Sequence, residues 1–222
     1  MKLNIKAKIT LLLMIFGLVP LAVVMPITFE KLDETRQARL ENLSSRADIV
    51  NEAIDRNLFE RYGDVQAFSL NSAIQDKNNW RNESDENPLI KAINGYMTNY
   101  GIYKLMLVLD RKGNVIAVNN VDPVGKELDT SSLYEKSFAD KSWFKNAIEG
   151  KFLESETLTG TAVEQPAYND VVAGVYGEDG FSMVFSAPIK NAEGKIIGVW
   201  ANFADFGLVE QIVADYHKKL KM

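Results

Sequence analysis

The chain has 222 residues, of which 46% are hydrophobic, with a net charge of −5 and no cysteine. The lack of cysteine excludes disulfides, thiol catalysis and thiolate metal sites, and the acidic balance provides no basic field for a nucleic-acid backbone. The single histidine, His217, lies near the C-terminus, so we expect no zinc site, no cofactor and no catalysis. The expected partners are small solutes or other proteins.

An uncharged apolar run from Ile9 to Ile27 follows a lysine-containing tail of residues 1–8 and predicts a transmembrane helix. The alternative is a cleaved signal peptide, but the run is longer than a usual signal-peptide core and lacks a small-residue cleavage site. Lysines before the run and acidic residues after it predict a cytoplasmic N-terminus. We therefore expect an anchor in the inner (cell) membrane, with the rest of the chain in the periplasm or outside the cell.

Residues 28–75 are expected to form one long amphipathic stalk helix, because they contain no proline and only one glycine, Gly63. Such a helix is longer than a small domain is wide, so part of its apolar stripe needs a partner outside its own domain. The simplest partner is a second copy of the same helix, so we expect a homodimer. The alternative is a helix that folds back near Gly63. The apolar stripe recurs at steps of three and four residues: Leu40, Leu43, Ala47, Val50, Ile54, Leu58, Val65 and Phe68.

Residues 76–205 read as a module of short elements around two hairpins, which predicts an α+β fold with a central antiparallel sheet flanked by helices. The second hairpin is apolar on both faces, so its strands are expected at the centre of the sheet. Residues 206–222 are expected to form a C-terminal helix that leads toward a second module or membrane span. The expected elements are a loop at 76–88, a helix at 88–100, strands at 103–109 and 115–118, a helical segment at 131–150, an irregular β-prone segment at 154–176, a turn at 177–180, strands at 181–189 and 195–203, and a helix at 208–220.

The start of the helical segment at 131–150 carries the best candidate for a binding site. Lys141, Trp143 and Phe144 combine a cation, an indole and a second ring, which suits a small polar metabolite with a carboxylate or an amine. The alternative is that both rings belong to the core and that Lys141 lies over them. Tyr168 and Asp170 are expected to face this helix, where Asp170 could complement a ligand ammonium, although both also suit an ordinary turn.

Three segments of the chain resemble the extracytoplasmic Cache domains of bacterial chemoreceptors, the methyl-accepting chemotaxis proteins: residues 107–116, 138–147 and 185–200. The resemblance implies a PAS-like sensor module behind a first membrane helix and a stalk helix. Cache modules also occur on histidine kinases and cyclic-dinucleotide enzymes, so the type of output domain stays open. A structural or interaction module without a small ligand is a further alternative.

The resemblance also implies a ligand site. Amino-acid-binding members carry an Arg-x-Trp-Tyr signature whose arginine holds the ligand carboxylate, and the matching stretch here is Lys141-Ser-Trp143-Phe144. Lysine lacks the bidentate fork and phenylalanine lacks the hydroxyl, which argues against an α-amino acid ligand. The family's late aspartate falls near Asn202. A receptor of this family continues through a second membrane helix into a signalling hairpin, so we expect this chain to be the sensory portion only.

Overall fold

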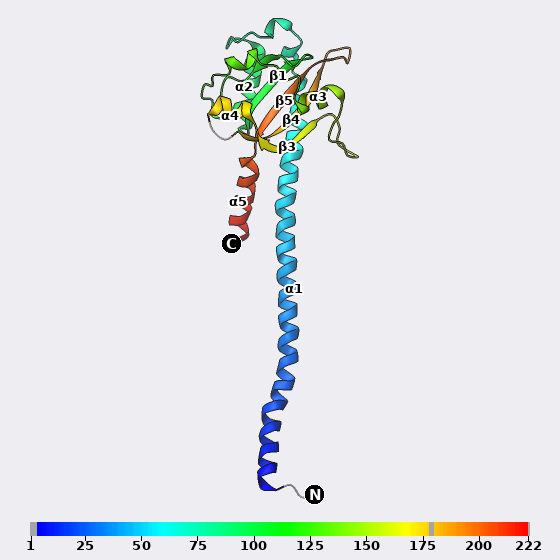
Figure 1. The fold of residues 1–222 in the computed structure, drawn as a ribbon, viewed down its shortest axis with the longest axis vertical. Coiled ribbons are helices and arrows are strands. Elements are labelled where there is room, and N and C mark those ends of the chain that lie inside the picture. Colours follow the sequence, from blue (N-terminus) through cyan, green and yellow to red (C-terminus); the bar gives the residue numbers. More distant parts are fainter. Residues whose placement is uncertain (1–3, 178–179, 222) are drawn as a thin grey trace. The chain divides into compact units, whose positions relative to one another are not determined.

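The computed structural model describes residues 4–177 and 180–221, which fall into two compact units, residues 1–52 and 53–222. The first three residues of the predicted tail and the middle of the turn predicted at 177–180 lie outside the described residues. The first unit is the N-terminal part of helix α1 (Ile5–Ser69), which includes Pro20 and Pro26 without a break (Figure 1). An 18-residue window of this helix has a mean hydropathy of 2.5 and no buried residue, so the helix is long and apolar enough to cross a membrane.

Helix α1 also passes through Gly63 without folding back, and it ends at Ser69, earlier than the predicted residue 75. The reason is local. Asn71 caps the short 3-10 helix η1 (Ser72–Ile74), because its Oδ1 accepts a hydrogen bond from the backbone N–H of Ala73 at 2.9 Å. A second 3-10 helix, η2 (Lys77–Asn79), lies in the segment predicted as a loop.

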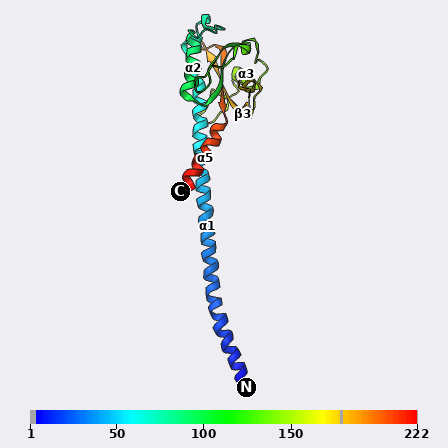
Figure 2. The same cartoon turned by 90° about the vertical axis from the view of Figure 1, so that its left-hand side faces the viewer.

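The second unit is built around a five-stranded antiparallel sheet with the order β2-β1-β5-β4-β3 (Figures 1 and 2). Both predicted hairpins are confirmed, and β5 is the central strand. The α+β prediction is therefore confirmed as well. The elements of this unit are α2 (Pro88–Tyr100), β1 (Tyr103–Asp110), β2 (Val115–Val118), η3 (Ser131–Glu135), α3 (Ser142–Glu149), β3 (Ala162–Tyr168), α4 (Asp170–Tyr176), β4 (Phe181–Lys190), β5 (Ile196–Asp205) and α5 (Gly207–Lys221).

Each face of the sheet carries its own hydrophobic core, and Figure 2 shows α2 and α3 on opposite sides of the strands. One core packs the C-terminal end of α1, through Val65 and Phe68, and helix α2 against the sheet. The other core packs α3, α4 and η3 against the opposite face. Side chains alternate along β5, so Trp200 enters the first core and Phe203 enters the second.

Two segments differ from the prediction. The segment 131–150 is not one helix, because the backbone N–H of Phe138 donates to the carbonyl of Gly113 at 2.8 Å and holds the chain extended between η3 and α3. The segment 154–176 is not irregular throughout, because its last residues form helix α4. That helix is capped by the Asn169 side chain, which accepts the N–H of Val171, and by Gly177 in the left-handed conformation.

Candidate functional site

A pocket of about 230 Å³ lies on the face of the sheet that α3 and α4 cover. Strand β3, at the edge of the sheet, contributes to its wall, together with the first residues of both helices. Part of its lining is aromatic: the Trp143 ring packs edge-on against Phe203, with ring centroids 5.7 Å apart and both side chains buried. The polar and charged residues of the lining include Lys141, Ser142, Glu164, Tyr168, Asp170 and Ser182.

Four of the six predicted site residues line this pocket: Lys141, Trp143, Tyr168 and Asp170. They come from the start of α3, the end of β3 and the start of α4. Trp143 is 3% exposed and belongs to the core as well as to the pocket, whereas Tyr168 is 62% exposed. The fold therefore brings these four residues together, while their role in binding stays a prediction.

The other two predicted residues, Phe144 and Asn202, do not line the pocket. Phe144 follows Trp143 in α3, its ring meets the Trp143 ring edge to face with centroids 6.4 Å apart, and it is buried in the core of this face. Asn202 faces the α1 side of the sheet, where its Oδ1 accepts a hydrogen bond from Trp200 Nε1 at 2.7 Å. The β5 residue that lines the pocket is the next one along the strand, Phe203.

Sequence reasoning missed several polar residues of the pocket, among them Glu164 and Ser182. The Ser142 hydroxyl donates a hydrogen bond to Glu164 Oε1, which brings this carboxylate to the first turn of α3. Ser182 is 2% exposed, and its Oγ has no hydrogen-bond partner in the part of the chain that the structure describes. The sequence signal for Ser182 was its spacing from Val184 in β4. Residues two apart in a strand share a face, so Ser182 lies on the covered face of the sheet with Val184.

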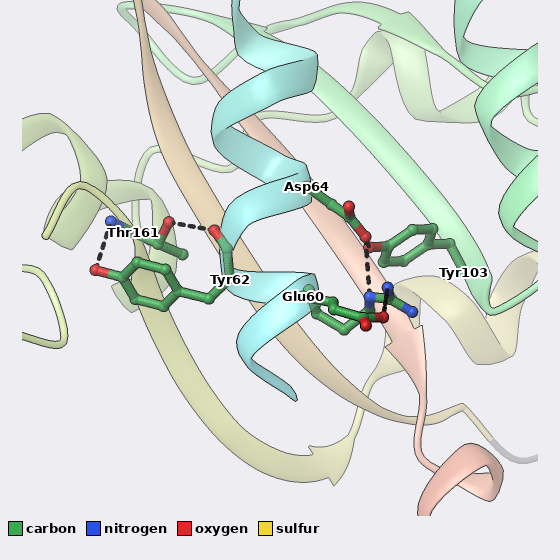
Figure 3. Close-up of polar contacts among 6 residues, drawn as sticks. Glu60, Tyr62, Asp64, Tyr103 and Thr161 are labelled. Atoms are coloured by element: carbon green, nitrogen blue, oxygen red, sulfur yellow. Dashed lines mark hydrogen bonds and ion pairs between the residues drawn. The ribbon is translucent and has the colours of Figure 1, made fainter. Parts of the chain in front are cut away.

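The segment that leads into β3 is tied directly to α1 (Figure 3). Thr161 Oγ1 donates to the backbone carbonyl of Tyr62 at 2.8 Å, and the backbone N–H of Thr161 donates to the Tyr62 hydroxyl at 3.3 Å. Gln66 Nε2 donates to the carbonyl of Thr159 and to Thr161 Oγ1, both at 2.9 Å. Because β3 begins at the next residue, the strand that lines the pocket continues into the contact with α1.

On the other side of the helix, a buried ion pair within α1 is linked to the sheet by Tyr103 of β1 (Figure 3). Arg61 is 6% exposed, and its Nε lies 2.9 Å from Asp64 Oδ2, which also accepts a hydrogen bond from the Tyr103 hydroxyl at 2.5 Å. Burial raises the pKa of Tyr103 far above its ordinary value, and the hydrogen bond to Asp64 raises it further. The hydroxyl therefore stays protonated and keeps donating to the carboxylate.

Solved structures of sensor domains share this fold. The sensor domain of the V. cholerae histidine kinase DctB matches 79% of this chain and 59% of its own, with a TM-score of 0.54 and 21% identity. The ligand-binding domain of the C. jejuni chemoreceptor Tlp3 in complex with L-valine matches 80% of this chain and 64% of its own, with a TM-score of 0.56 and 15% identity. The ligand-binding domain of the P. aeruginosa amino acid chemoreceptor PctC in complex with GABA matches 78% and 64%, with a TM-score of 0.52 and 14% identity.

The chain has the fold of a Cache-type sensor domain. It spans less than two thirds of the length of these three structures. No protein-family model matches the sequence, and no curated protein matches it significantly. Within the described parts of this Cache-type fold, no group of three or more histidine, aspartate or glutamate side chains is placed to hold a metal ion.

Proposed function

We propose that this chain is the extracytoplasmic ligand-sensing region of a bacterial chemotaxis receptor and that the pocket beside Trp143 binds a small polar metabolite. The observation that carries the proposal is the pocket itself, which combines an aromatic wall with charged side chains of both signs on a Cache-type fold. Two of the compared structures are chemoreceptor domains, and they hold L-valine and GABA. In this proposal the chain catalyses no reaction, needs no cofactor and binds no nucleic acid.

The apolar part of α1 supports a membrane anchor. We propose that the segment Ile9–Ile27 crosses the inner membrane with its N-terminus in the cytoplasm and the sensor module in the periplasm, since lysines precede it and acidic residues follow it. Farther along the helix, Leu40 and Leu43 are 58% and 62% exposed. A second copy of the chain would cover these side chains, which supports a homodimer through the stalk.

Binding is proposed to act on α1 through β3. A ligand that contacts the Glu164 and Tyr168 region of β3 would shift this strand, and the hydrogen bonds of Thr161 to Tyr62 and Gln66 would pass the shift to α1. The buried pair of Arg61 and Asp64 holds the other side of the helix to the sheet through Tyr103 and thereby limits how far the helix moves alone.

The second candidate is the sensor of a histidine kinase, favoured by the likeness to the DctB sensor domain. A cyclic-dinucleotide enzyme would use such a sensor in the same way, and the coding sequence downstream of this chain distinguishes the three outputs. A purely structural module is less well supported, because a close-packed core beside Trp143 would leave no pocket there.

The experiment is a thermal-unfolding screen of the full chain in detergent micelles against a panel of small metabolites. A ligand of the pocket is expected to raise the unfolding temperature, and the rise should grow with the logarithm of the ligand concentration once this exceeds the Kd. Ala167 lines the pocket with an exposed side chain, so Ala167→Trp fills the pocket while removing no contact that a ligand needs. Ala214→Trp, on the exposed face of α5, is the matched control.

The proposal predicts that Ala167→Trp abolishes the temperature shift of the best compound and that Ala214→Trp retains it. A shift that survives Ala167→Trp would move the site elsewhere in the protein. A panel without any binding compound, at concentrations up to about 10 mM, would favour the structural module, because a ligand with a Kd of about 1 mM would still stabilise the folded chain by about 1.4 kcal/mol at that concentration, which is detectable.

A further inference from the structure

The first turn of α3 already holds a carboxylate that belongs to the protein. Ser142 donates its hydroxyl hydrogen to Glu164, and Lys141 stands at the N-cap without a side-chain capping bond. The free N–H groups and the dipole of a helix N-terminus favour a negative group at this position. We propose that Glu164 occupies the place of a ligand carboxylate and that the pocket therefore selects a small primary amine without a carboxylate, an inference that rests on the proposed function of the pocket.

The charges of the pocket support a cationic ligand. Among the described residues that line it, Lys141 is the one cation, whereas Glu164 and Asp170 are both carboxylates. With Lys141 and Glu164 balancing each other, Asp170 is left as a carboxylate without an opposite charge, and no ion pair of Asp170 is present in the described residues. A monocation neutralises this pocket, whereas a zwitterion leaves the excess negative charge in place and brings a second anion toward Glu164.

A buried hydroxyl without a partner gives a second, independent indication of a ligand. Ser182 lines the pocket, is 2% exposed, and its Oγ has no hydrogen-bond partner among the residues of the described ranges. Buried polar groups are almost always hydrogen-bonded, so an unpaired one that faces a pocket calls for a polar ligand atom. An ammonium carries three donors, which suits a hydroxyl oxygen and a carboxylate such as Asp170.

The remaining lining defines the rest of the ligand. The lining includes the buried rings of Trp143 and Phe203, the buried Val184 and the exposed ring of Tyr168. An aromatic ring attracts a cation and also accepts the hydrocarbon groups next to an amine. With a volume near 230 Å³, the pocket is smaller than a typical drug-sized site of about 300–1,000 Å³, so the amine is a small one.

The test uses matched triads of compounds that share one side chain: an amino acid, the amine that lacks its carboxylate, and the acid that lacks its amine. The first triad is L-valine, isobutylamine and isovalerate, and parallel triads start from alanine, leucine and serine. Affinities of the full chain in micelles are measured by titration calorimetry. The best-binding triad is expected to bind its amine at least about tenfold more tightly than its amino acid and its acid, because the like-charge contact with Glu164 opposes both carboxylates.

Glu164→Gln then provides the decisive variant. It keeps the side-chain size and the acceptor for Ser142 but removes the charge, so the preference for the amine over the amino acid is expected to fall at least about tenfold. Glu193→Gln, at an exposed turn between β4 and β5, is the matched control and should leave the preference unchanged.

The outcomes separate this inference from the proposed function. If the wild-type chain binds the amino acid or the acid more tightly than the amine, the inference is overturned and ligand sensing stays intact. The same holds if Glu164→Gln leaves the preference for the amine over the amino acid unchanged. If all triads fail but the wider screen finds pocket ligands without an ammonium group, the inference is also overturned and ligand sensing stays intact. Failure of every compound in both experiments removes the proposed function, and the inference with it.

Discussion

The buried pair on α1 allows a quantitative prediction of how the helix is held to the sheet. The side chains of Arg61 and Asp64 are 8% and 14% exposed, so solvent screens their 2.9 Å contact very little. Arg61→Met leaves the Asp64 carboxylate buried with the Tyr103 hydroxyl as its remaining partner in the network of Figure 3. Removing one partner of a buried pair costs about 3–5 kcal/mol, and the Tyr103 hydrogen bond places the expected loss near the lower limit, about 3 kcal/mol.

The reverse change is expected to cost less. Asp64→Asn keeps an oxygen that accepts the Tyr103 hydroxyl, and Arg61 retains its contact with Glu60 at 3.0 Å, where the Glu60 side chain is 56% exposed. We expect a loss of about 1–2 kcal/mol, since one charge-assisted interaction is removed and a half-exposed one remains. In the Arg61→Met background the same Asp64→Asn change removes an unpaired buried charge, so it should cost nothing or restore stability.

The assay is urea unfolding of the full chain in micelles, followed by tryptophan fluorescence. The three tryptophans, Trp80, Trp143 and Trp200, all lie in the unit of residues 53–222, so the signal reports the unfolding of this unit. A loss of about 3 kcal/mol is a large part of the 5–15 kcal/mol typical of a domain and is readily measured. A loss of less than about 1 kcal/mol for Arg61→Met, or additive losses for the two changes, would show that the pair does not hold the helix in this way.

Three further predictions concern signal transmission, ligand charge and assembly. Thr161→Val removes the two hydrogen bonds of the Thr161 hydroxyl, to the Tyr62 carbonyl and from Gln66, and should lower the stability by about 1–2 kcal/mol. Amine affinity, measured by calorimetry, should change less than about threefold, since Thr161 does not line the pocket. Lys141→Gln should retain or strengthen amine binding in the same titration, because it removes a like charge, and a complete loss would instead indicate a ligand carboxylate at this lysine. Leu43→Glu should weaken a stalk dimer in cross-linking experiments, and an unchanged cross-linking yield would exclude this face from the interface.

The parts of the fold that depend on local chemistry were predictable from the sequence. The turns of the two hairpins place Gly113 and Gly194 at φ values of 82° and 77°, where glycine is favoured. In the first turn, Asp110 Oδ1 accepts the backbone N–H groups of Lys112 and Asn114 at 2.8 and 3.0 Å. Helix α2 was predicted with its correct bounds, because Pro88 and Gly101 mark its two ends.

The parts that depend on distant contacts were not predictable in this way. The break in the segment 131–150 comes from the hydrogen bond between Phe138 and Gly113, which belongs to the first hairpin. Helix α4 was overlooked because the adjacent Val171 and Val172 favour a strand, although a capping asparagine and a terminal glycine flank the helix. Tertiary packing on the sheet overrides this weak local preference.

The residues of the candidate site also fall into those that local sequence predicts and those that depend on distant contacts. The group around Lys141 and Trp143 is contiguous in sequence and could be identified from its residue types, as could Asp170. The contribution of Glu164 depends on which face of β3 it occupies, and this requires the strand itself, which was hidden in a segment interrupted by Pro166. The face that Asn202 occupies also depends on the strand, since a shift of one residue in a strand moves a side chain to the opposite face.

The position of β3 explains how a small pocket can act on a long helix. β3 is an edge strand that pairs only with β4, and its register shifts between Glu164 and Ala167, on either side of Pro166. Proline is tolerated at an edge because it lacks the N–H that a second neighbour would need. Such a strand can shift by breaking bonds on one side only, whereas the central β5 is held on both sides. In the proposed mechanism, the ligand therefore acts on an edge strand of the sheet, and Thr161 delivers the displacement to Tyr62 on α1.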